Sequence, residues 1–511
     1  MLKRGFGKKV VAAFLIAILV VSVVGCGPKE QTTGGAKDSL TIGIVADATT
    51  MDAQMFNDNM TEGIVSNIYD PIVRVTPDGE IVPCIAEKWE ISEDGRVYTF
   101  DIKQGVKFHN GDELTLDDVV FTLNRCKESS FVGTYFSYIE DVKTQGDHQV
   151  VVTLAYPYSS FMPILACYSG VVSKKLLTED PDSMARNPVG TGPYKFVKWE
   201  PENVIVMEAF EDYHAGAAPI KNVTFRIIGS ASTGTISLQK GSIDAYVNVS
   251  SVDRQTVKDD EHLELLERSS GAFRFLGINC EVKPFDDVRV RQAIAHAIDK
   301  EAVVIGAEDG NGVVAVSHIP EGVVGYDPNF KDLEHDVEKA KALLADAGYP
   351  EGFECTLTTT ENRSMHAQII QADLKKIGID VKIELLESGT FYEDLENGDF
   401  ELQILGWSYI AQDPDVAIYD LYKSDNALAG NYGRYANPKM DELLEKARVS
   451  TDTAERQKLY EEVEALCRDD AFNIVIYWTV ANIGFNKDLR GVQVSPKSTY
   501  FVYPFHWADG E

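Results

Sequence analysis

Hydrophobic and polar positions along this chain alternate first with the period of a strand and then with the period of a helix. Residues 40–45 read Leu-Thr-Ile-Gly-Ile-Val, which predicts a strand, and the mixed stretch 61–69 predicts a helix after it. Residues 89–107 contain short strand-like runs broken by Glu-Asp-Gly and Gln-Gly, which predict hairpins. The chain therefore enters an α/β layer and continues into a β-rich segment.

A helix is predicted next, over residues 114–126, and either Thr115 or Asp117 can cap its N-terminus. Strand-like runs follow at 150–154 and 203–208, with loop sequences around them. This part of the chain is predicted to be richer in strands than the parts on either side of it.

A second region of α/β character begins near residue 273. An apolar run at 275–278 precedes a helix predicted over 287–299, in which the apolar side chains share one face. The alternation continues with helices at 337–347, 366–377, 438–448 and 454–468 and strands at 353–358, 381–385, 400–405 and 474–478. The layout predicts two α/β lobes, an inserted β-rich piece and a cleft between the lobes.

The first 26 residues differ in character from the rest. Four basic residues within the first nine precede an apolar run at 10–24, which is short for a membrane span and has the proportions of a signal peptide. The run ends in Val-Val-Gly-Cys at 23–26, which resembles the lipobox of bacterial lipoproteins. That resemblance implies cleavage before Cys26 and a diacylglyceryl group on its thiol. An uncleaved anchor helix with an incidental cysteine is the alternative.

Charge and composition exclude several classes of partner. The full chain has 48 basic and 80 acidic residues, a formal charge of −32, and loss of residues 1–25 leaves 44 against 80, or −36. Nucleic-acid binding draws on clustered Lys and Arg, so we expect no nucleic-acid partner. Residues 26–39 are small and polar and predict a flexible tether, and no later run is long enough for a membrane span.

The sequence contains none of the common short motifs of catalysis or of metal binding. It has no Gly-x-Ser-x-Gly elbow, no His-Glu-x-x-His and no Walker loop. Its nine histidines are scattered, and the six cysteines after Cys26 form no Cys-x-x-Cys pair, so neither a zinc site nor a disulfide framework can be read. We expect free, buried cysteines, no catalytic residues, no metal and no cofactor.

A series of short motifs, in a fixed order over most of the chain, carries a family resemblance. The motifs lie at 85–90, 97–100, 105–111, 114–121, 189–194, 287–294, 340–348, 406–407, 413–415, 435–438 and 440–444. Within the motif at 189–194, Gly190, Gly192 and Pro193 predict a turn in which glycine supplies a positive φ. Singly the motifs are weak, and together they resemble the family 5 extracellular solute-binding proteins, the dipeptide-, oligopeptide- and nickel-binding components of ABC importers.

The resemblance implies a fold and a division into domains. The expected fold is α/β, a two-lobed periplasmic-binding-protein type II-like fold with an inserted β-rich subdomain and a hinged ligand cleft. The expected parts are a lipoprotein signal peptide (1–25), a flexible tether (26–39), lobe I (40–73, 181–272 and 489–511), an inserted subdomain of lobe I (74–180) and lobe II (273–488).

The resemblance also directs attention to the segment after Gly406-Trp407, which in peptide-binding members runs beside the ligand. Trp407 would present an apolar wall there, unless it is a core residue. Those members place an aspartate three residues after this tryptophan to hold the peptide ammonium, whereas this chain has Ile410, which cannot pair with a charge. Asp413 or Asp415 could replace it if the loop turns back, and a cap or turn role is their alternative.

Other candidate ligand contacts are proposed by residue type. Arg363 could pair with a ligand carboxylate in bidentate fashion. Asn431 lies where the family often has an asparagine. The aromatic candidates for the cleft, each with ordinary packing as its alternative, are Phe56, Tyr135, Phe136, Tyr409 and Tyr432.

The expected function is capture of a solute, most simply a peptide, by closure of two lobes, and delivery to a membrane permease without catalysis. The expected partners are ABC permease subunits and, through an acylated Cys26, the outer face of the cytoplasmic membrane; the expected state is a monomer. Within the family, the alternatives are an oligosaccharide or a metal chelate. From other classes, a ligand sensor for a membrane receptor and a secreted hydrolase remain open.

Overall fold

A computed structural model of the chain describes residues 37–56, 58–77, 79–409, 413–428, 430–495 and 499–508. The predicted signal peptide, Cys26 and Ile410 lie outside these described residues. Residues Asp38–Ala508 form one unit by their internal contacts. No helix within the described residues has both the length and the apolar composition that crossing a membrane requires.

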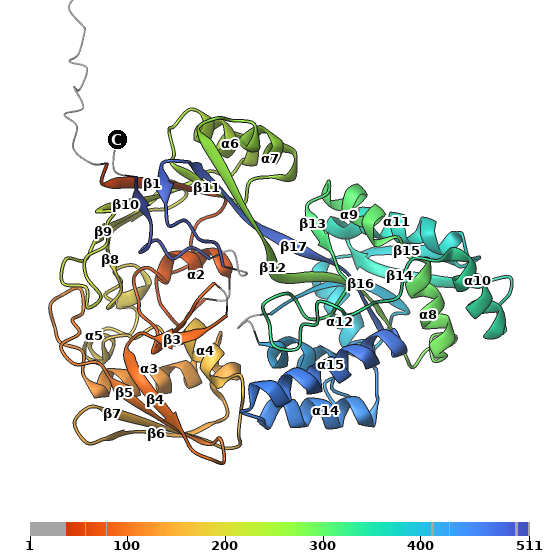
Figure 1. The fold of residues 1–511 in the computed structure, drawn as a ribbon, viewed down its shortest axis with the longest axis horizontal. Helices are drawn as coiled ribbons and strands as arrows, with labels where there is room; N and C mark the ends of the chain where they lie inside the picture. Colours follow the sequence, from red (N-terminus) through yellow and green to blue (C-terminus); the bar gives the residue numbers. More distant parts are fainter. Residues whose placement is uncertain are drawn as a thin grey trace, which may run out of the picture. The chain divides into compact units, whose positions relative to one another are not determined.

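An eleven-stranded sheet runs through the protein, and its two longest strands, β12 (Leu263–Ile278) and β17 (Asn473–Asn486), connect its two halves (Figure 1). The order is β15-β14-β16-β12-β17-β11-β1-β10-β9-β8, with β13 on β17. The first half contains β1 (Ser39–Ile44), β8 (Tyr194–Glu200), β9 (Val204–Ala209), β10 (Asn222–Ile227) and β11 (Ala245–Val247). The second half contains β13 (Gly312–Val314), β14 (Glu354–Thr360), β15 (Asp380–Leu386) and β16 (Leu402–Ser408). We call these halves, with the helices packed on them, the first and second lobes.

The first lobe has its own apolar core, in which alternate residues of β1 pack against β10, β9 and the C-terminal segment. Ile483 and Phe485 of β17 belong to this core, which favours ending the second lobe before the last residues of β17. The other domain limits predicted from the sequence remain predictions. The other elements of the first lobe are α2 (Asn59–Val65), α5 (Lys174–Glu179), η2 (Ser183–Ala185), α6 (Ala231–Gln239), α7 (Ser251–Lys258), β18 (Leu489–Arg490) and β19 (His506–Trp507).

The predicted β-rich insertion is a four-stranded antiparallel sheet with a separate core. The order of its strands is β4-β5-β7-β6, and α3 (Leu116–Glu128) begins at Thr115, which forms a capping box with Asp118. Thr115 is therefore the N-cap, one of the two residues that the sequence allowed. Its elements are β2 (Val73–Val75), β3 (Ile81–Pro83), β4 (Ala86–Ile91), β5 (Val97–Ile102), η1 (Gly133–Phe136), β6 (Ile139–Gln145), β7 (Gln149–Leu154) and α4 (Phe161–Tyr168).

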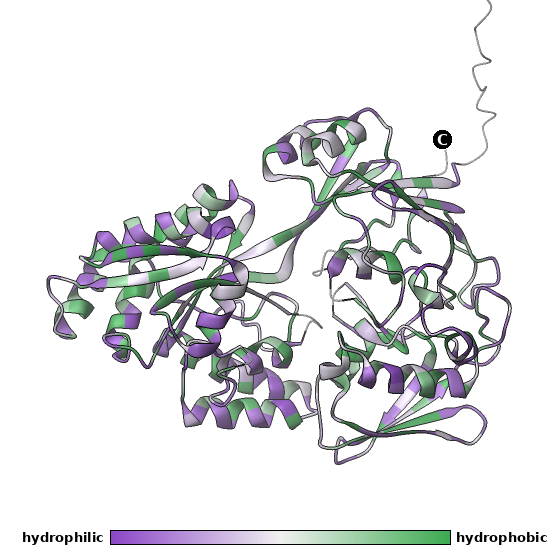
Figure 2. Cartoon of the chain, turned by 180° about the vertical axis from the view of Figure 1, so that it is seen from behind, coloured by the Kyte–Doolittle hydropathy of each residue, from purple (hydrophilic) through white to green (hydrophobic). Residues whose placement is uncertain are grey.

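The second lobe carries an apolar core on each face of its part of the sheet. Helices α8, α9, α10 and α11 cover one face, and α12, α14 and α15 cover the other. In Figure 2 these helices carry purple stripes beside green ones, as amphipathic helices do. The helical elements are α8 (Val288–Ala297), α9 (Lys300–Glu308), α10 (Val337–Asp346), η3 (Glu361–Arg363), α11 (Ser364–Lys375), α12 (Ser388–Asn397), η4 (Asp415–Tyr419), α13 (Asp420–Tyr422), α14 (Pro438–Val449) and α15 (Thr453–Asp470).

The positions of Gly190 and Gly192 in the Gly-x-Gly-Pro motif require glycine for a different reason from the one predicted. Neither Gly190 nor Gly192 has a positive φ. A Cβ at Gly192 would lie 2.6 Å from the backbone carbon of Ile68, and one at Gly190 would overlap the Ile68 carbonyl oxygen. Close approach of two backbones, and not turn geometry, therefore requires glycine here.

The six described cysteines form no disulfide. Four of them are buried, as expected, whereas Cys167 and Cys280 are partly exposed. Burial raises the pKa of the Cys84 and Cys355 thiols to about 12. These thiols are therefore protonated packing residues at neutral pH.

Candidate functional site

Three parallel strands of the second lobe end at one edge of the sheet. Strand β14 is parallel to both β15 and β16, so Thr360, Leu386 and Ser408 end their strands on the same side. In open α/β sheets, ligands bind outside the carboxyl ends of the strands. Trp407 and Arg363, which were predicted from the sequence, both lie at this edge.

Strand β16 leaves part of its backbone unpaired at this edge. It pairs with β12 along its whole length, but on its other side β14 pairs only with Leu402 and Gln403. The N–H of Tyr409 donates to the carbonyl of Gly271, which makes the odd-numbered positions the ones that bond to β12. The N–H and C=O groups of Gly406 and Ser408 therefore point away from β12, where no described strand pairs with them.

The aromatic candidates of the second lobe do different things. Trp407 is partly exposed and packs at the margin of the core that contains α14 and α15. Tyr409 is buried and donates its hydroxyl to the carbonyl of His318 at 2.7 Å. Tyr432 is also buried in that core, and the Asn431 amide bonds to the carbonyls of Lys423 and Tyr435. Of these four residues, only Trp407 offers side-chain surface at the edge.

Asp413 and Asp415 are used inside the protein. Asp413 is 4% exposed and forms a bidentate pair with Arg456, with distances of 2.8 and 2.9 Å. Asp415 is fully buried and pairs with Arg448 at 2.9 Å. Asp413 also accepts from the N–H of Asp415, so the turn role left open by the sequence fits these contacts. Both carboxylates are buried and paired with arginines, so neither is placed to bind a ligand ammonium.

The segment after β16 also contacts the inserted subdomain. The hydroxyl of Ser160, just before α4, donates to Asp413 at 2.6 Å, and the N–H of Ser159 donates to the carbonyl of Arg448 at 2.9 Å. Val416 packs in the core of the inserted subdomain. The start of α4 is therefore attached to the loop that follows Trp407.

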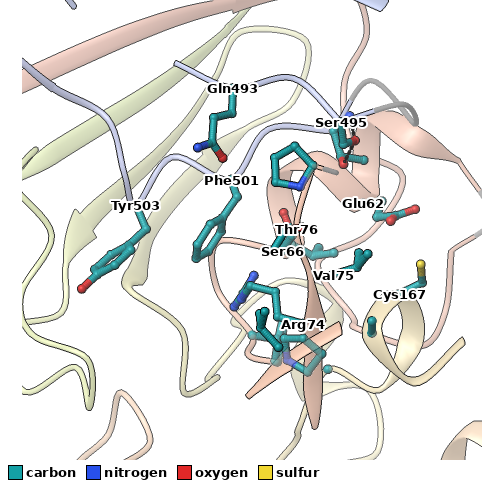
Figure 3. A pocket seen from close by; sticks show the side chains of 18 of the residues that line it. Glu62, Ser66, Arg74, Val75, Thr76, Cys167, Gln493, Ser495, Phe501 and Tyr503 are labelled. Atoms are coloured by element: carbon teal, nitrogen blue, oxygen red, sulfur yellow. Dashed lines mark hydrogen bonds between the residues drawn. The ribbon is translucent and has the colours of Figure 1, made fainter. Parts of the chain in front are cut away.

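Helix α4 also lines a cavity of about 500 Å³ in the first lobe (Figure 3). The cavity lies between α2, β2, β3, α4 and the C-terminal segment, and Phe56 is among its apolar lining residues. Arg74 crosses its floor with the guanidinium 3.9 Å from the centre of the Phe501 ring. Its size and its mixture of apolar walls with few polar groups are those of a small-molecule site. Other lining residues are Glu62, Ser66, Tyr69, Cys167, Gln493 and Tyr503.

The two remaining aromatic candidates belong to the inserted subdomain. Phe136 is completely buried in its core, which is the packing alternative for that residue. Tyr135 is partly exposed and stacks on Tyr168 with ring centres 5.5 Å apart. Neither residue lines the cavity in the first lobe.

A buried polar cluster next to the cavity tests whether a metal would fit. Ligand atoms of Asp70, Cys84 and His214 lie within 4.8 Å of one another. Arg74 donates to Asp70 at 2.8 Å, and the ammonium of Lys103 lies 3.2 Å from Nδ1 of His214. Because an ammonium can only donate, His214 accepts there, and its Nε2–H donates to Asp70. Two cations beside the group disfavour a divalent metal, so we assign it as a hydrogen-bond network.

The charge of Asp70 is held by this network. Burial alone would raise the pKa of Asp70, but the hydrogen bond from His214 and the charge of Arg74 bring it below its ordinary value. The carboxylate in turn fixes the guanidinium of Arg74 under Phe501. Arg74 is a residue of the cavity that the sequence reasoning missed.

The comparisons with known proteins agree with this architecture. Residues 80–429 match the bacterial extracellular solute-binding proteins, family 5 Middle. The chain is 30% identical to the dipeptide-binding protein of Escherichia coli over 82% of this chain and 84% of the relative. It is 31% identical to heme-binding protein A of Haemophilus influenzae over 82% of each chain.

A solved structure extends the similarity to the fold. HbpA2 from Haemophilus parasuis superposes with a TM-score of 0.87 at 30% identity, covering 92% of this chain and all of that one. The expected type II-like periplasmic-binding-protein fold is therefore confirmed. The family match covers well over half of the sequence. The chain belongs to the bacterial extracellular solute-binding proteins of family 5.

Proposed function

We propose that this protein captures a peptide between its two lobes and delivers it to the permease of an ABC importer, without chemical change of the ligand. The observation that carries the peptide is the unpaired backbone of Gly406 and Ser408 at the open side of β16. An extended peptide can add there as a further strand, with its own N–H and C=O groups bonding to those of β16. Such bonds recognise any peptide backbone and leave side-chain choice to the surroundings.

Apolar surfaces in the two lobes supply the rest of the binding. The indole of Trp407 lies next to the open backbone, and the cavity in the first lobe offers room for a ligand side chain. Attachment of the α4 start to Asp413 and Arg448 couples the two lobes around these surfaces. Closure is then favoured by ligand contacts that both lobes make together.

The proposal includes the anchoring of the protein. The lipobox-like sequence at 23–26 supports acylation of Cys26, which would hold the protein at the outer face of the cytoplasmic membrane. Mass spectrometry of the membrane fraction tests this directly. A diacylglyceryl group on an N-terminal Cys26 is expected, and an N-terminus at Met1 would contradict it.

The test of peptide capture is calorimetry with di- to hexapeptides. A peptide that binds is compared with a version N-methylated at one central amide, which keeps the side chains and removes one backbone donor. We expect at least a tenfold loss, about 1.4 kcal/mol. Trp407→Ala should also weaken binding tenfold or more, whereas Trp89→Ala on β4, also a partly exposed tryptophan, should not. Failure of every peptide to bind would refute the proposal.

A further inference from the structure

Two arginines meet at the carboxyl edge of the second lobe. Arg274 on β12 lies opposite Gly406 of β16, and its guanidinium occupies the space that a side chain at Gly406 would fill. Arg363 follows the end of β14 at the start of α11. Strand β14 is in register with β16 and β16 with β12, so the end of β14 and Arg274 come to the same edge of the sheet. The positive charge of Arg274 adds to burial in lowering the pKa of Arg363, as expected of two guanidiniums that lie near each other.

Neither guanidinium has a carboxylate partner among the described residues. The nearby acid, Glu308, accepts instead from the hydroxyl of Tyr477 at 2.5 Å and from Nε2 of His366 at 3.0 Å. Arg274 has one weak bond, from Nη1 to the carbonyl of Phe273 at 3.4 Å.

Most of the donors of this pair are unspent. Nη1 of Arg363 donates to Thr360 at 3.3 Å and its side chain bonds to Tyr392, but its Nε is buried and has no described acceptor. An arginine has five N–H donors in a fixed fork, so each of the two side chains can still take a carboxylate.

The two arginines differ from other buried or partly buried arginines in how few of their donors are used. Some such arginines of the described structure stand against carboxylates, as Arg456 does against Asp413 and Arg125 against Asp52, and others, such as Arg291, spend their donors on backbone carbonyls. Arg274 and Arg363 do neither to a comparable extent.

Two adjacent cations repel each other, and the repulsion is stronger where water is partly excluded. The charge of Arg274 contributes to the lowered pKa of Glu308, but that carboxylate is bonded to Tyr477 and His366 and, in the described structure, forms no ion pair with either arginine. An anionic ligand group would remove that repulsion.

We propose that Arg274 and Arg363 form a subsite for a ligand end that carries two carboxylates, as a peptide with Asp or Glu as its last residue does. The inference rests on the proposed function, because it places the end of the peptide beside the open backbone of Gly406. Each fork takes one carboxylate in bidentate geometry, one the terminal carboxylate and the other the acidic side chain. The subsite thus selects acidic C-terminal residues.

Calorimetry with matched tripeptides tests the selection. We expect Ala-Ala-Glu to bind at least tenfold more tightly than Ala-Ala-Gln, which has the same shape and lacks the second charge. In Arg274→Gln this ratio should fall to within twofold. Arg226→Gln makes the same change of charge at an exposed residue of β10, and there the ratio should stay. Equal binding of the two peptides by the unmodified protein overturns the inference and leaves the proposed function intact.

A second variant keeps the test valid if Arg274→Gln misfolds. A second probe keeps it valid if no tripeptide binds. In Gly406→Ala the new methyl group displaces the Arg274 guanidinium without changing any charge, so the Glu-over-Gln ratio should fall while circular dichroism stays unchanged. Glutarate, a dicarboxylate without a peptide bond, should raise the melting temperature of the unmodified protein and of Arg226→Gln but not of Arg274→Gln. If no tripeptide binds, this probe alone decides, and an equal effect on all three proteins overturns the subsite.

Discussion

The pair of Asp413 and Arg456 is expected to be the most sensitive ion pair beside the site, and Arg456→Met tests it. The side chains are 5% and 8% exposed, and the bidentate contact is supplemented by bonds from Ser160 and from the N–H of Asp415. Methionine keeps much of the arginine volume but leaves the carboxylate buried without a counter-charge. Breaking a buried pair in this way costs about 3–5 kcal/mol.

The stability lost in Arg456→Met should depend on pH, because the ion pair lowers the pKa of Asp413 in the folded protein. Burial would raise the pKa of Asp413, but Arg456 and Ser160 bring it below its ordinary value. A carboxyl whose folded pKa is lowered adds stability above its unfolded value of about 3.9 and loses it as the pH falls through the folded pKa. In Arg456→Met the effect of burial dominates and raises the pKa of Asp413. The loss in the free energy of unfolding, relative to the unmodified protein, should therefore be largest at pH 8 and shrink toward pH 4.

Urea unfolding followed by circular dichroism measures the loss, with two companion variants. Lys446→Met removes an exposed i,i+4 partner of Glu442 on α14 and should leave the free energy of unfolding nearly unchanged. Asp413→Asn combined with Arg456→Met removes both charges and should recover more than half of the loss. A loss below about 1 kcal/mol for Arg456→Met, or no recovery in the double variant, would refute the reasoning.

Two further predictions concern titration and reactivity. Burial, and then the charge of Asp415, raise the pKa of Asp420 to about 7, so this carboxyl destabilises the fold increasingly as the pH rises from about 4 to 7. Asp420→Asn should therefore raise the melting temperature more at pH 8 than at pH 5, and an equal change at both would contradict this assignment. Cys167 lines the cavity in the first lobe and is partly exposed, so a bound ligand should slow its alkylation by maleimide. Cys280 lies outside the cavity and is the internal control; equal slowing of both, measured by peptide mass mapping, would argue against ligand in the cavity.

Local signals predicted the elements well where a cap or a short period determines them. Helix α14 was predicted at 438–448 and is observed at Pro438–Val449, because Asn437 caps it and proline takes the first position. Strand β17 was predicted only at 474–478, yet it continues to Asn486. Its second half contains the buried polar residue Asn482 and is held by pairing with β11 and β12, which the local pattern does not reveal.

The candidate site was predictable only where one segment carries the signal. Trp407 belongs to the Gly-Trp motif and Arg363 was proposed by residue type, and both lie at the carboxyl edge of the second-lobe sheet. Asp413 was a reasonable ammonium anchor by position, but its partner Arg456 comes from α15, and no spacing in the sequence joins the two. Arg274 was missed for the same reason, since its neighbour Gly406 is brought to it by the register of β12 and β16.

The charge of the proposed subsite is opposite in sign to the net charge of the protein. A net charge of −32 would suggest a preference for cations, but charges further apart than about 8 Å are screened in physiological salt. The charge that a ligand encounters depends on which nearby side chains are already paired inside the protein. At the edge of β16 the carboxylates of Asp413 and Asp415 are turned inward onto arginines, whereas Arg274 and Arg363 keep free donors at the ligand edge. The local field therefore favours an acidic ligand end on an acidic protein.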